Sequence, residues 1–170
     1  VILRKAKPVF ADINKFDLNL DVKSVEKKIN KRTKAIIVVH YGGIPCDMKK
    51  FMEIAKKYKL LVIEDAAHAF LSKFKKKFIG TIGDLGAFSF HETKNIVGGQ
   101  CGALSINNKR FIKRANIILD KGTNRFSMGK KNYYSWKDIG SEYRAPELSS
   151  ALTYSQLMKI KIIQKKRGKL

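Results

Sequence analysis

Two short apolar runs separated by one amphipathic segment place the strongest constraint on the fold of this chain. Lys34–His40 contains Ala-Ile-Ile-Val-Val, and Leu60–Ile63 is equally free of polar residues. Strands without polar alternation are typical of a sheet covered on both faces, as parallel sheets are. Between them, behind Asp47, apolar residues recur at helical spacing: Met48, Phe51, Met52 and Ala55. We therefore predict a right-handed βαβ unit with parallel strands, and hence an α/β fold.

The remaining segments extend this pattern in both directions along the chain. The predicted elements are strands at Val9–Ile13, Asp84–Phe90 and Ala103–Ile106, a surface hairpin at Lys73–Phe78, helices after Asp21, Asn108 and Pro146, and a long loop at Lys121–Asp138. In the helix after Asn108, the residues expected to face inward are Phe111, Ile112, Ala115, Ile118 and Leu119. The order of elements predicts a three-layer domain with a mostly parallel sheet.

The amino-acid composition and the net charge limit which classes of protein this chain can belong to. The chain has 170 residues, 44% of them apolar, which is enough for the core of a single domain. Its formal net charge of +22 first suggests a nucleic-acid partner. However, most of the 36 basic residues are lysines, and no Arg-rich stacking or recognition motif is present. We interpret the charge as compositional bias, keep an anionic partner as the alternative, and do not expect nucleic acid to be a partner.

Neither a membrane span nor an export signal is visible. No apolar run reaches the roughly eighteen residues that a spanning helix needs, and no signal peptide is recognisable. Two cysteines, Cys46 and Cys101, do not make a disulfide framework, so we expect a cytoplasmic protein with no membrane partner. The sequence begins at Val1 without a methionine and stops at Leu170 within a basic helical pattern, which we interpret as a piece of a longer protein.

Polar side chains with useful chemistry follow the predicted strands. Asp65 ends one strand and His68 comes one short turn later, while Ser89 and Lys94 lie at and just beyond the end of another. In parallel sheets, the carboxyl ends of strands meet at one edge, where ligands bind. Other interpretations stay open: Asp65 as a helix N-cap, His68 as a core residue, Ser89 as an ordinary strand serine, and Lys94 as a lysine in solvent.

A carboxylate and a lysine at one edge of a sheet suit pyridoxal phosphate. The neutral amine of a lysine forms a Schiff base with an aldehyde, and a carboxylate beside the pyridine nitrogen keeps that nitrogen protonated. Lys94 and Asp65 could take these two roles, with His68 near the 3-oxygen of the ring and Ser89 near the phosphate.

At these positions the chain resembles the DegT/DnrJ/StrS family of sugar aminotransferases. The matching motifs are Pro8–Ile13, Thr33–Ile37, His40–Gly42, Pro45–Met48, Glu64–Ala69, Gly80–Asp84, Phe88–Phe90 and Thr93–Asn95. The separation of 29 residues from Asp65 to Lys94 (94 − 65) also follows the family pattern. Phe90–Asn95, Lys121–Arg125 and Trp136–Ser141 are most similar to members that aminate a dTDP-linked sugar.

The resemblance implies a fold and a reaction. The fold is that of aspartate aminotransferase, fold type I, with residues 1–170 as a partial cofactor-binding large domain that lacks the amino-terminal phosphate-loop segment and the carboxyl-terminal small domain. Lys94 would be the catalytic Schiff-base lysine, and Asp65, His68 and Ser89 would bind pyridoxal phosphate. The reaction would transfer an amino group from glutamate to a 4-keto-6-deoxy nucleotide sugar, in a homodimer that serves cell-surface polysaccharide or lipopolysaccharide synthesis.

Some positions depart from the family pattern. Gln100 and Cys101 replace a Glu-Gly pair after the lysine, and a cysteine has less backbone freedom than glycine. Glu142 stands near the place of an Asn that reaches the neighbouring subunit's phosphate, where only Arg144 could compensate its charge. Leu71 replaces a common glycine. These departures favour an alternative, a catalytically inactive fragment or interaction subunit that keeps the fold.

Overall fold

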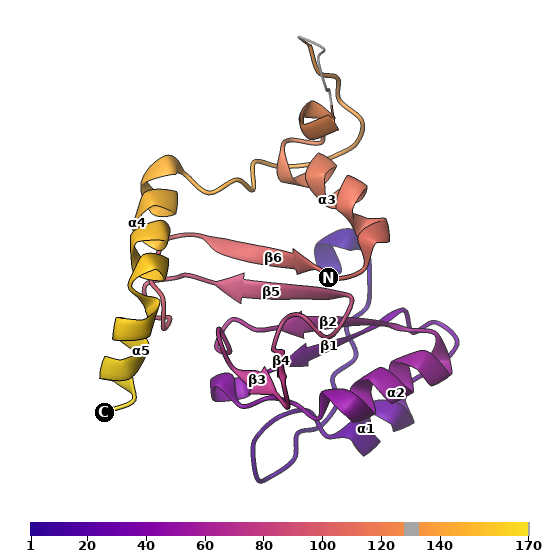
Figure 1. Ribbon diagram of the computed structural model, residues 1–170. Coiled ribbons are helices and arrows are strands. Elements are labelled where there is room, and N and C mark those ends of the chain that lie inside the picture. Colours follow the sequence, from indigo (N-terminus) through magenta and orange to yellow (C-terminus); the bar gives the residue numbers. More distant parts are fainter. Residues whose placement is uncertain (128–132, 170) are drawn as a thin grey trace. The chain divides into compact units, whose positions relative to one another are not determined.

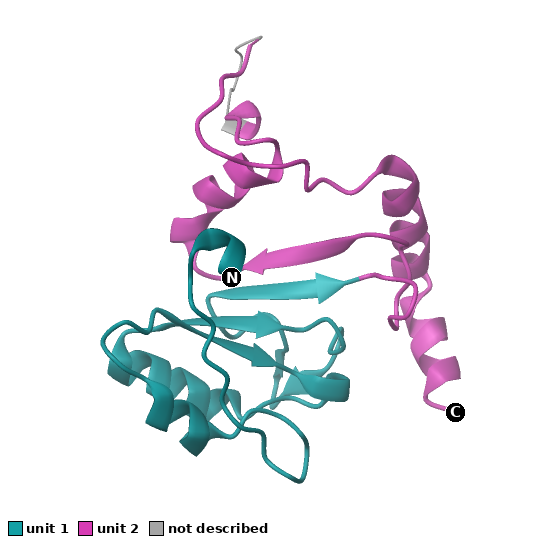
Figure 2. Ribbon diagram, turned by 180° about the vertical axis from the view of Figure 1, so that it is seen from behind, with its two compact units in different colours: residues 1–89 teal, residues 90–170 magenta. Residues whose placement is uncertain are grey.

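The computed structural model describes residues 1–127 and 133–169, and the chain divides into two compact units. Unit 1 is Val1–Ser89 and unit 2 is Phe90–Leu170, shown in teal and magenta in Figure 2.

A parallel sheet forms the centre of unit 1. Its strands are β1 (Ala35–Val39), β2 (Leu61–Asp65) and β5 (Leu85–Ser89), in the order β1-β2-β5, and both neighbouring pairs are parallel. Val39 lies opposite Asp65, and Asp65 lies opposite Ala87. The predicted βαβ unit is therefore confirmed, and the register brings the carboxyl ends of all three strands to one edge.

Two helices of unit 1 begin at the predicted aspartates. The side chain of Asp21 accepts a hydrogen bond from the N–H of Ser24 at the start of α1 (Val22–Lys28). Asp47 does the same for Lys50 at the start of α2 (Met48–Tyr58). Such caps satisfy backbone donors that the first turn of a helix leaves unpaired. In Figure 1, α1 and α2 lie side by side on the same side of the three strands.

The core of unit 1 lies between the strands and α2. Its fully buried members include apolar residues from β1, α2 and β2, namely Val38, Met48, Phe51 and Val62. On β1, however, Ile37 and Val39 point to the other side and are 44% and 42% exposed. The prediction that this strand is covered on both faces is wrong within unit 1, because the helices of this unit cover one face of an edge strand.

Two further predictions for unit 1 have different outcomes. The hairpin is confirmed as β3 (Lys73–Phe74) and β4 (Lys77–Phe78), an antiparallel pair outside the main sheet. The strand predicted at Val9–Ile13 is wrong, since this segment forms only an isolated bridge from Ile13 to Leu20. A short apolar segment in the sequence does not show whether a neighbouring strand is available to pair with it. Two short 3-10 turns complete the unit: η1 (Ile2–Arg4) and η2 (Tyr41–Gly43).

The described residues of unit 2 form one strand and a series of helices. They are β6 (Gly102–Ile106), η3 (Lys109–Phe111), α3 (Ile112–Leu119), η4 (Arg125–Ser127), α4 (Glu147–Met158) and α5 (Ile160–Arg167). The strand and the helices after Asn108 and Pro146 are thus confirmed. The helix after Asn108 starts as a 3-10 turn, and Ile112 is 43% exposed rather than inward-facing. Part of the predicted loop, 128–132, lies outside the described residues.

Candidate active site

Asp65 lies at the carboxyl end of the central strand of unit 1. Its Oδ1 accepts a hydrogen bond from the N–H of Ala67 at 3.0 Å, and its Oδ2 has no hydrogen bond to any residue that the structure describes. The chain turns after Asp65 without forming a helix, so the N-cap interpretation is wrong. A half-buried carboxylate with one oxygen fixed and the other open is suited to pair with a ligand cation.

His68 is presented to solvent next to Asp65. Its imidazole is exposed, which rules out the interpretation as a core histidine. The ring packs at a tilt against Tyr41, with 6.4 Å between the centroids. Gly43 lies close to the backbone of His68: a Cβ at that glycine would come within 2.9 Å of the His68 carbonyl oxygen. The loop after β1 therefore supports the backbone that carries His68.

The most extensively bonded group at this edge is one that the sequence did not single out. Glu64, next to Asp65 on β2, is fully buried, as is His40 at the end of β1. The His40 Nε2 lies 3.2 Å from the Glu64 Oε2. Because the His40 Nδ1 accepts the N–H of Cys46 at 3.1 Å, the ring proton is on Nε2 and donates to the carboxylate.

Three backbone donors complete the shell around Glu64. Gly80 donates to Oε2 at 2.9 Å, and Ile82 and Gly83 donate to Oε1 at 2.7 Å each. Burial alone would raise the pKa of the Glu64 carboxyl, but the bonds from His40 and from these N–H groups lower it below its ordinary value. Glu64 is therefore a buried anion that ties β1, β2 and the turn before β5 together.

The turn before β5 and the start of β5 leave no room for a side chain at Gly83 or Gly86. A Cβ at Gly86 would lie 2.1 Å from the carbonyl oxygen of Gly80, and one at Gly83 would lie 2.7 Å from that of Val62. Asp84 adds a further tie, since its Oδ2 accepts the N–H of Val62 at 2.9 Å. These contacts fix β5 against β2, so that Ser89 ends its strand at the same edge as Asp65.

Ser89 is half-buried and is the last residue of β5 and of unit 1. Lys94 comes five residues later and belongs to unit 2. Unit 1 therefore brings together three of the four predicted site residues, Asp65, His68 and Ser89, while Lys94 is described in its own unit.

Lys94 sits in a closed turn. Its N–H donates to the carbonyl of His91 at 2.9 Å, and its side chain is half-buried rather than free in solvent. The ends of the turn are joined because Phe90 donates to the Cys101 carbonyl at 2.9 Å and accepts from Gly98 at 2.6 Å. The lysine is therefore carried on a short, internally bonded loop.

This loop packs against α4. The Thr153 Oγ1 lies 3.1 Å from the Cys101 Sγ and donates to the Ser149 carbonyl at 2.7 Å. A Cβ at Gly98 would lie 1.9 Å from that hydroxyl. Cys101 does not adopt a left-handed backbone, whereas Gly99 does, with φ 77°. The cysteine thus takes no conformation that requires glycine.

Two other departures from the family pattern have structural outcomes. Leu71 has φ 70°, the left-handed conformation that the family's glycine would adopt without steric cost. Glu142 pairs with Arg144, whose Nε lies 2.8 Å away, and with the Lys121 Nζ at 2.6 Å. Hydrogen bonds from Arg144 and Lys121 lower the pKa of Glu142. Its charge is therefore compensated by two cations, one of them the arginine that the sequence suggested.

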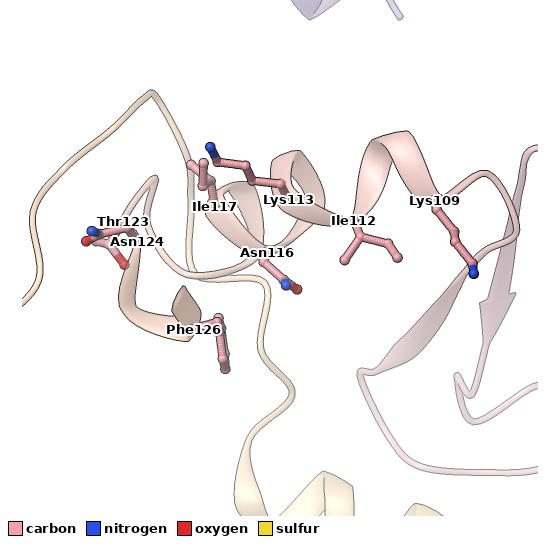
Figure 3. A pocket seen from close by; sticks show the side chains of 8 residues that line it. All are labelled: Lys109, Ile112, Lys113, Asn116, Ile117, Thr123, Asn124 and Phe126. Carbon is pink, nitrogen blue, oxygen red and sulfur yellow. The ribbon is translucent and has the colours of Figure 1, made fainter. Parts of the chain in front are cut away.

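Unit 2 contains a cavity of about 340 Å³, and none of the four predicted site residues lines it. Figure 3 shows its lining, which comes from α3, from Lys109 before it and from the segment 123–126. Its polar lining consists of lysine, asparagine and threonine side chains, with no carboxylate that could pair with a pyridine nitrogen. The cavity is therefore not the predicted cofactor site.

The sequence pattern of the DegT/DnrJ/EryC1/StrS aminotransferase family matches residues 1–170, the whole chain. The chain belongs to this family. The predicted family is confirmed, and with it the use of pyridoxal phosphate, on which the aminotransferases of the DegT/DnrJ/EryC1/StrS family depend. Asp65, with its open oxygen, fits such a cofactor.

Individual relatives agree with this assignment. The spore coat polysaccharide biosynthesis protein SpsC of Bacillus subtilis is 36% identical over 175 residues, covering 100% of this chain and 45% of SpsC. GDP-perosamine synthase of Escherichia coli O157:H7 is 39% identical over 153 residues, covering 89% of this chain and 40% of that protein. The solved structure of Helicobacter pylori PseC, an aminotransferase of pseudoaminic acid biosynthesis, matches with a TM-score of 0.85 and 33% identity, covering 93% of this chain and 42% of PseC.

These matches support the fold and define its extent. The likeness to PseC confirms the predicted α/β class with a mostly parallel sheet, the fold of pyridoxal-phosphate-dependent sugar aminotransferases. The chain spans less than half the length of the curated relatives it matches. None of the helices in residues 1–127 and 133–169 is long and apolar enough to cross a membrane.

Proposed function

We propose that residues 1–170 form the cofactor-binding part of a sugar-nucleotide aminotransferase that uses pyridoxal phosphate. The observation that carries this proposal is Asp65 at the carboxyl end of β2, with one carboxylate oxygen fixed by Ala67 and the other open. Family membership supplies the reaction class.

Asp65 would bind the protonated pyridine nitrogen through its open oxygen. When bound, pyridoxal phosphate supplies an electron sink that makes a substrate C–H bond acidic. The carboxylate of Asp65 keeps that nitrogen positive, and the fixed turn at Ala67 holds the carboxylate in place. The network around Glu64 supports the strand beneath it.

Three further side chains would complete the site. His68, exposed beside Asp65, would donate to or accept from the 3-oxygen of the ring, and Ser89 at the end of β5 would contact the phosphate. Lys94 would attach the cofactor through its amine and then move the proton at the reacting carbon. The closed turn around Lys94 limits the conformations that its backbone can reach.

The substrate that we propose is a 4-keto-6-deoxy sugar linked to dTDP, with glutamate as amino donor. The resemblance of Phe90–Asn95, Lys121–Arg125 and Trp136–Ser141 supports dTDP, whereas the name of the E. coli relative specifies a GDP-sugar. A panel of dTDP-, GDP- and UDP-linked keto sugars tests this choice directly. We further propose a cytoplasmic homodimer, with residues 1–170 as part of its large domain and the product used in cell-surface polysaccharide or lipopolysaccharide synthesis, as the name of SpsC suggests for that relative.

The alternative is a fragment or interaction subunit that keeps the fold without turnover. Its support came from departures at Gln100, Cys101 and Glu142, of which two are accounted for: Cys101 has an ordinary backbone, and Glu142 is paired with two cations. These observations favour the enzyme.

Cofactor affinity tests the proposal without requiring turnover. Pyridoxal phosphate is titrated into the purified chain and its absorbance followed for wild type, Asp65→Asn and the control Asp12→Asn, which alters an exposed aspartate. Loss of a charged hydrogen bond predicts roughly ten- to a hundredfold weaker binding for Asp65→Asn. Equal affinity of all three proteins would overturn the role of Asp65.

A further inference from the structure

A lysine-rich hairpin projects from unit 1 and has no part in the proposed reaction. We define the lysine hairpin as residues 72–79, which include β3 and β4. Its two strands pair antiparallel, with Lys73 opposite Phe78 and Phe74 opposite Lys77. Figure 1 shows β3 and β4 as a small ribbon of their own beside the parallel strands.

Four of the eight residues in the lysine hairpin are lysines, and all four are exposed: Lys73, Lys75, Lys76 and Lys77. None of them forms an ion pair with a residue in the part of the chain that the structure describes. On the neighbouring helix α2, by contrast, Lys50 pairs with Asp47 at 3.1 Å and Lys49 pairs with Glu53. The hairpin therefore concentrates positive charge that ion pairs among the described residues do not neutralise, and Asp47 attracts Lys75 only from beyond ion-pair distance.

The two phenylalanines of the hairpin differ in burial. Phe74 packs against the hydrophobic core of unit 1, and Ile79 at the base of the hairpin is buried. Phe78 points outward, 44% exposed, with the Lys73 Nζ 4.5 Å from its ring centre. The Lys75 Nζ lies 5.7 Å from the ring centre of Phe74. The hairpin thus presents lysines around one outward aromatic edge on an anchored base.

The backbone at the base and the tip of the hairpin fixes how its lysines are displayed. Ile79 donates to the Ser72 carbonyl at 2.9 Å, which closes the base of the hairpin. At the tip, Lys75 has φ 55°, a left-handed conformation that glycine or asparagine would adopt more easily. The sequence therefore has a lysine at a position where backbone sterics favour a smaller residue.

We propose that the lysine hairpin is a docking surface for an anionic lipid membrane. Lysine clusters are attracted to anionic headgroups as point charges, and an exposed aromatic edge inserts at the interface. Nucleic acid fits less well, because the hairpin holds no arginine for bidentate contacts and one face of each of its two rings already carries a lysine ammonium group of the hairpin. The sequence predicted no membrane partner, because it shows neither a spanning segment nor a signal peptide. A peripheral contact requires neither of these.

Vesicle binding by the whole chain tests this docking surface. The chain is sedimented with vesicles of phosphatidylglycerol and phosphatidylcholine, or of phosphatidylcholine alone. The hairpin variant carries Lys→Gln at 73, 75, 76 and 77. The control carries Lys→Gln at 23, 27, 28 and 31, four exposed lysines on and after α1, so that both variants lose the same net charge.

The two variants should differ sharply. At roughly fivefold in partitioning per lysine near an anionic surface, the hairpin variant should bind anionic vesicles at least about fiftyfold more weakly, and the control less than about fivefold. Phe78→Ser should weaken binding about tenfold and leave the salt dependence unchanged, because it removes apolar insertion rather than charge. Circular dichroism confirms that each variant is folded.

Several results would overturn the inference. Equal losses in the hairpin variant and the control would mean that binding follows overall charge. No binding of the wild type to anionic vesicles would exclude the membrane outright. Hairpin-dependent binding to poly(U) RNA without vesicle binding would assign the surface to nucleic acid instead. None of these results bears on cofactor binding at Asp65, so this inference and the proposed function fail independently.

Discussion

Replacing Glu64 by glutamine is the most informative single change for the stability of unit 1. The carboxylate accepts four N–H donors, two on each oxygen, from His40, Gly80, Ile82 and Gly83. Glutamine has the same shape but offers one acceptor oxygen and one NH₂ group. Whichever way the amide turns, its NH₂ faces two donors that then lack a partner.

A change of tautomer at His40 cannot restore the lost hydrogen bonds without breaking another one. If His40 moved its proton to Nδ1, the Nε2 could accept from the new amide, but Nδ1 would then oppose the N–H of Cys46. An unsatisfied buried donor costs about 1–3 kcal/mol, and charge-assisted bonds are lost as well. We therefore expect Glu64→Gln to lower the free energy of unfolding by about 4 kcal/mol.

Urea unfolding followed by circular dichroism measures this difference. The matched control is Glu53→Gln on α2, whose side chain is 62% exposed and reaches Lys49 only at 4.0 Å. That change should cost less than about 0.5 kcal/mol, as exposed pairs do. A cost for Glu64→Gln as small as that of the control would refute the description of Glu64 as a buried, fully bonded anion.

Four further outcomes are expected. The pKa of Glu64 in the folded state lies below its ordinary value of 4.5. The stabilisation by its carboxylate is therefore fully present above about pH 4.5 and is lost as the pH falls through the folded-state pKa. The free energy of unfolding of Glu64→Gln should accordingly change less with pH below 4.5 than that of wild type. Gly86→Ala should destabilise by about 3 kcal/mol in urea, since its Cβ meets the Gly80 carbonyl, whereas Gly42→Ala, with φ 58° and open space, should cost about 1 kcal/mol; similar costs would contradict the packing described. Burial, and secondarily Asp17, raises the pKa of the Cys46 thiol to about 12, so iodoacetamide at pH 8 should label Cys46 only after unfolding; rapid labelling of the folded chain would argue against that burial. Thr153→Val should lower stability by about 1 kcal/mol in the same urea assay, because the bonds to Ser149 and Cys101 are lost, and an unchanged midpoint would speak against this docking of α4.

Local patterns in the sequence were sufficient to predict most of the helices and strands, although not at Val9–Ile13, and to predict the position of Asp65. The apolar runs of β1 and β2 and the helical spacing after Asp47 determined the βαβ unit. Once the strands are parallel, Asp65 falls at their carboxyl edge without further information. The hairpin at Lys73–Phe78 likewise follows from its own alternation.

Contacts between segments far apart in the chain could not be predicted from the sequence. Glu64 is bonded by residues 16 to 24 positions away, so no local pattern shows that its carboxylate is buried and satisfied. The available signals were a glutamate directly after the apolar residues of β2 and the glycines at 80 and 83. The exposure of Ile37 and Val39 was missed for the same reason, since a run of apolar residues does not specify which face the helices cover.

Covalent attachment of pyridoxal phosphate at Lys94 is the most direct test of the proposed function. The purified chain is incubated with pyridoxal phosphate, reduced with borohydride, digested and mapped by mass spectrometry. We expect the modification to be concentrated at Lys94, to be lost in Lys94→Ala, and to fall strongly in Asp65→Asn. Modification spread evenly over the chain's other lysines, and unaffected by either substitution, would contradict it.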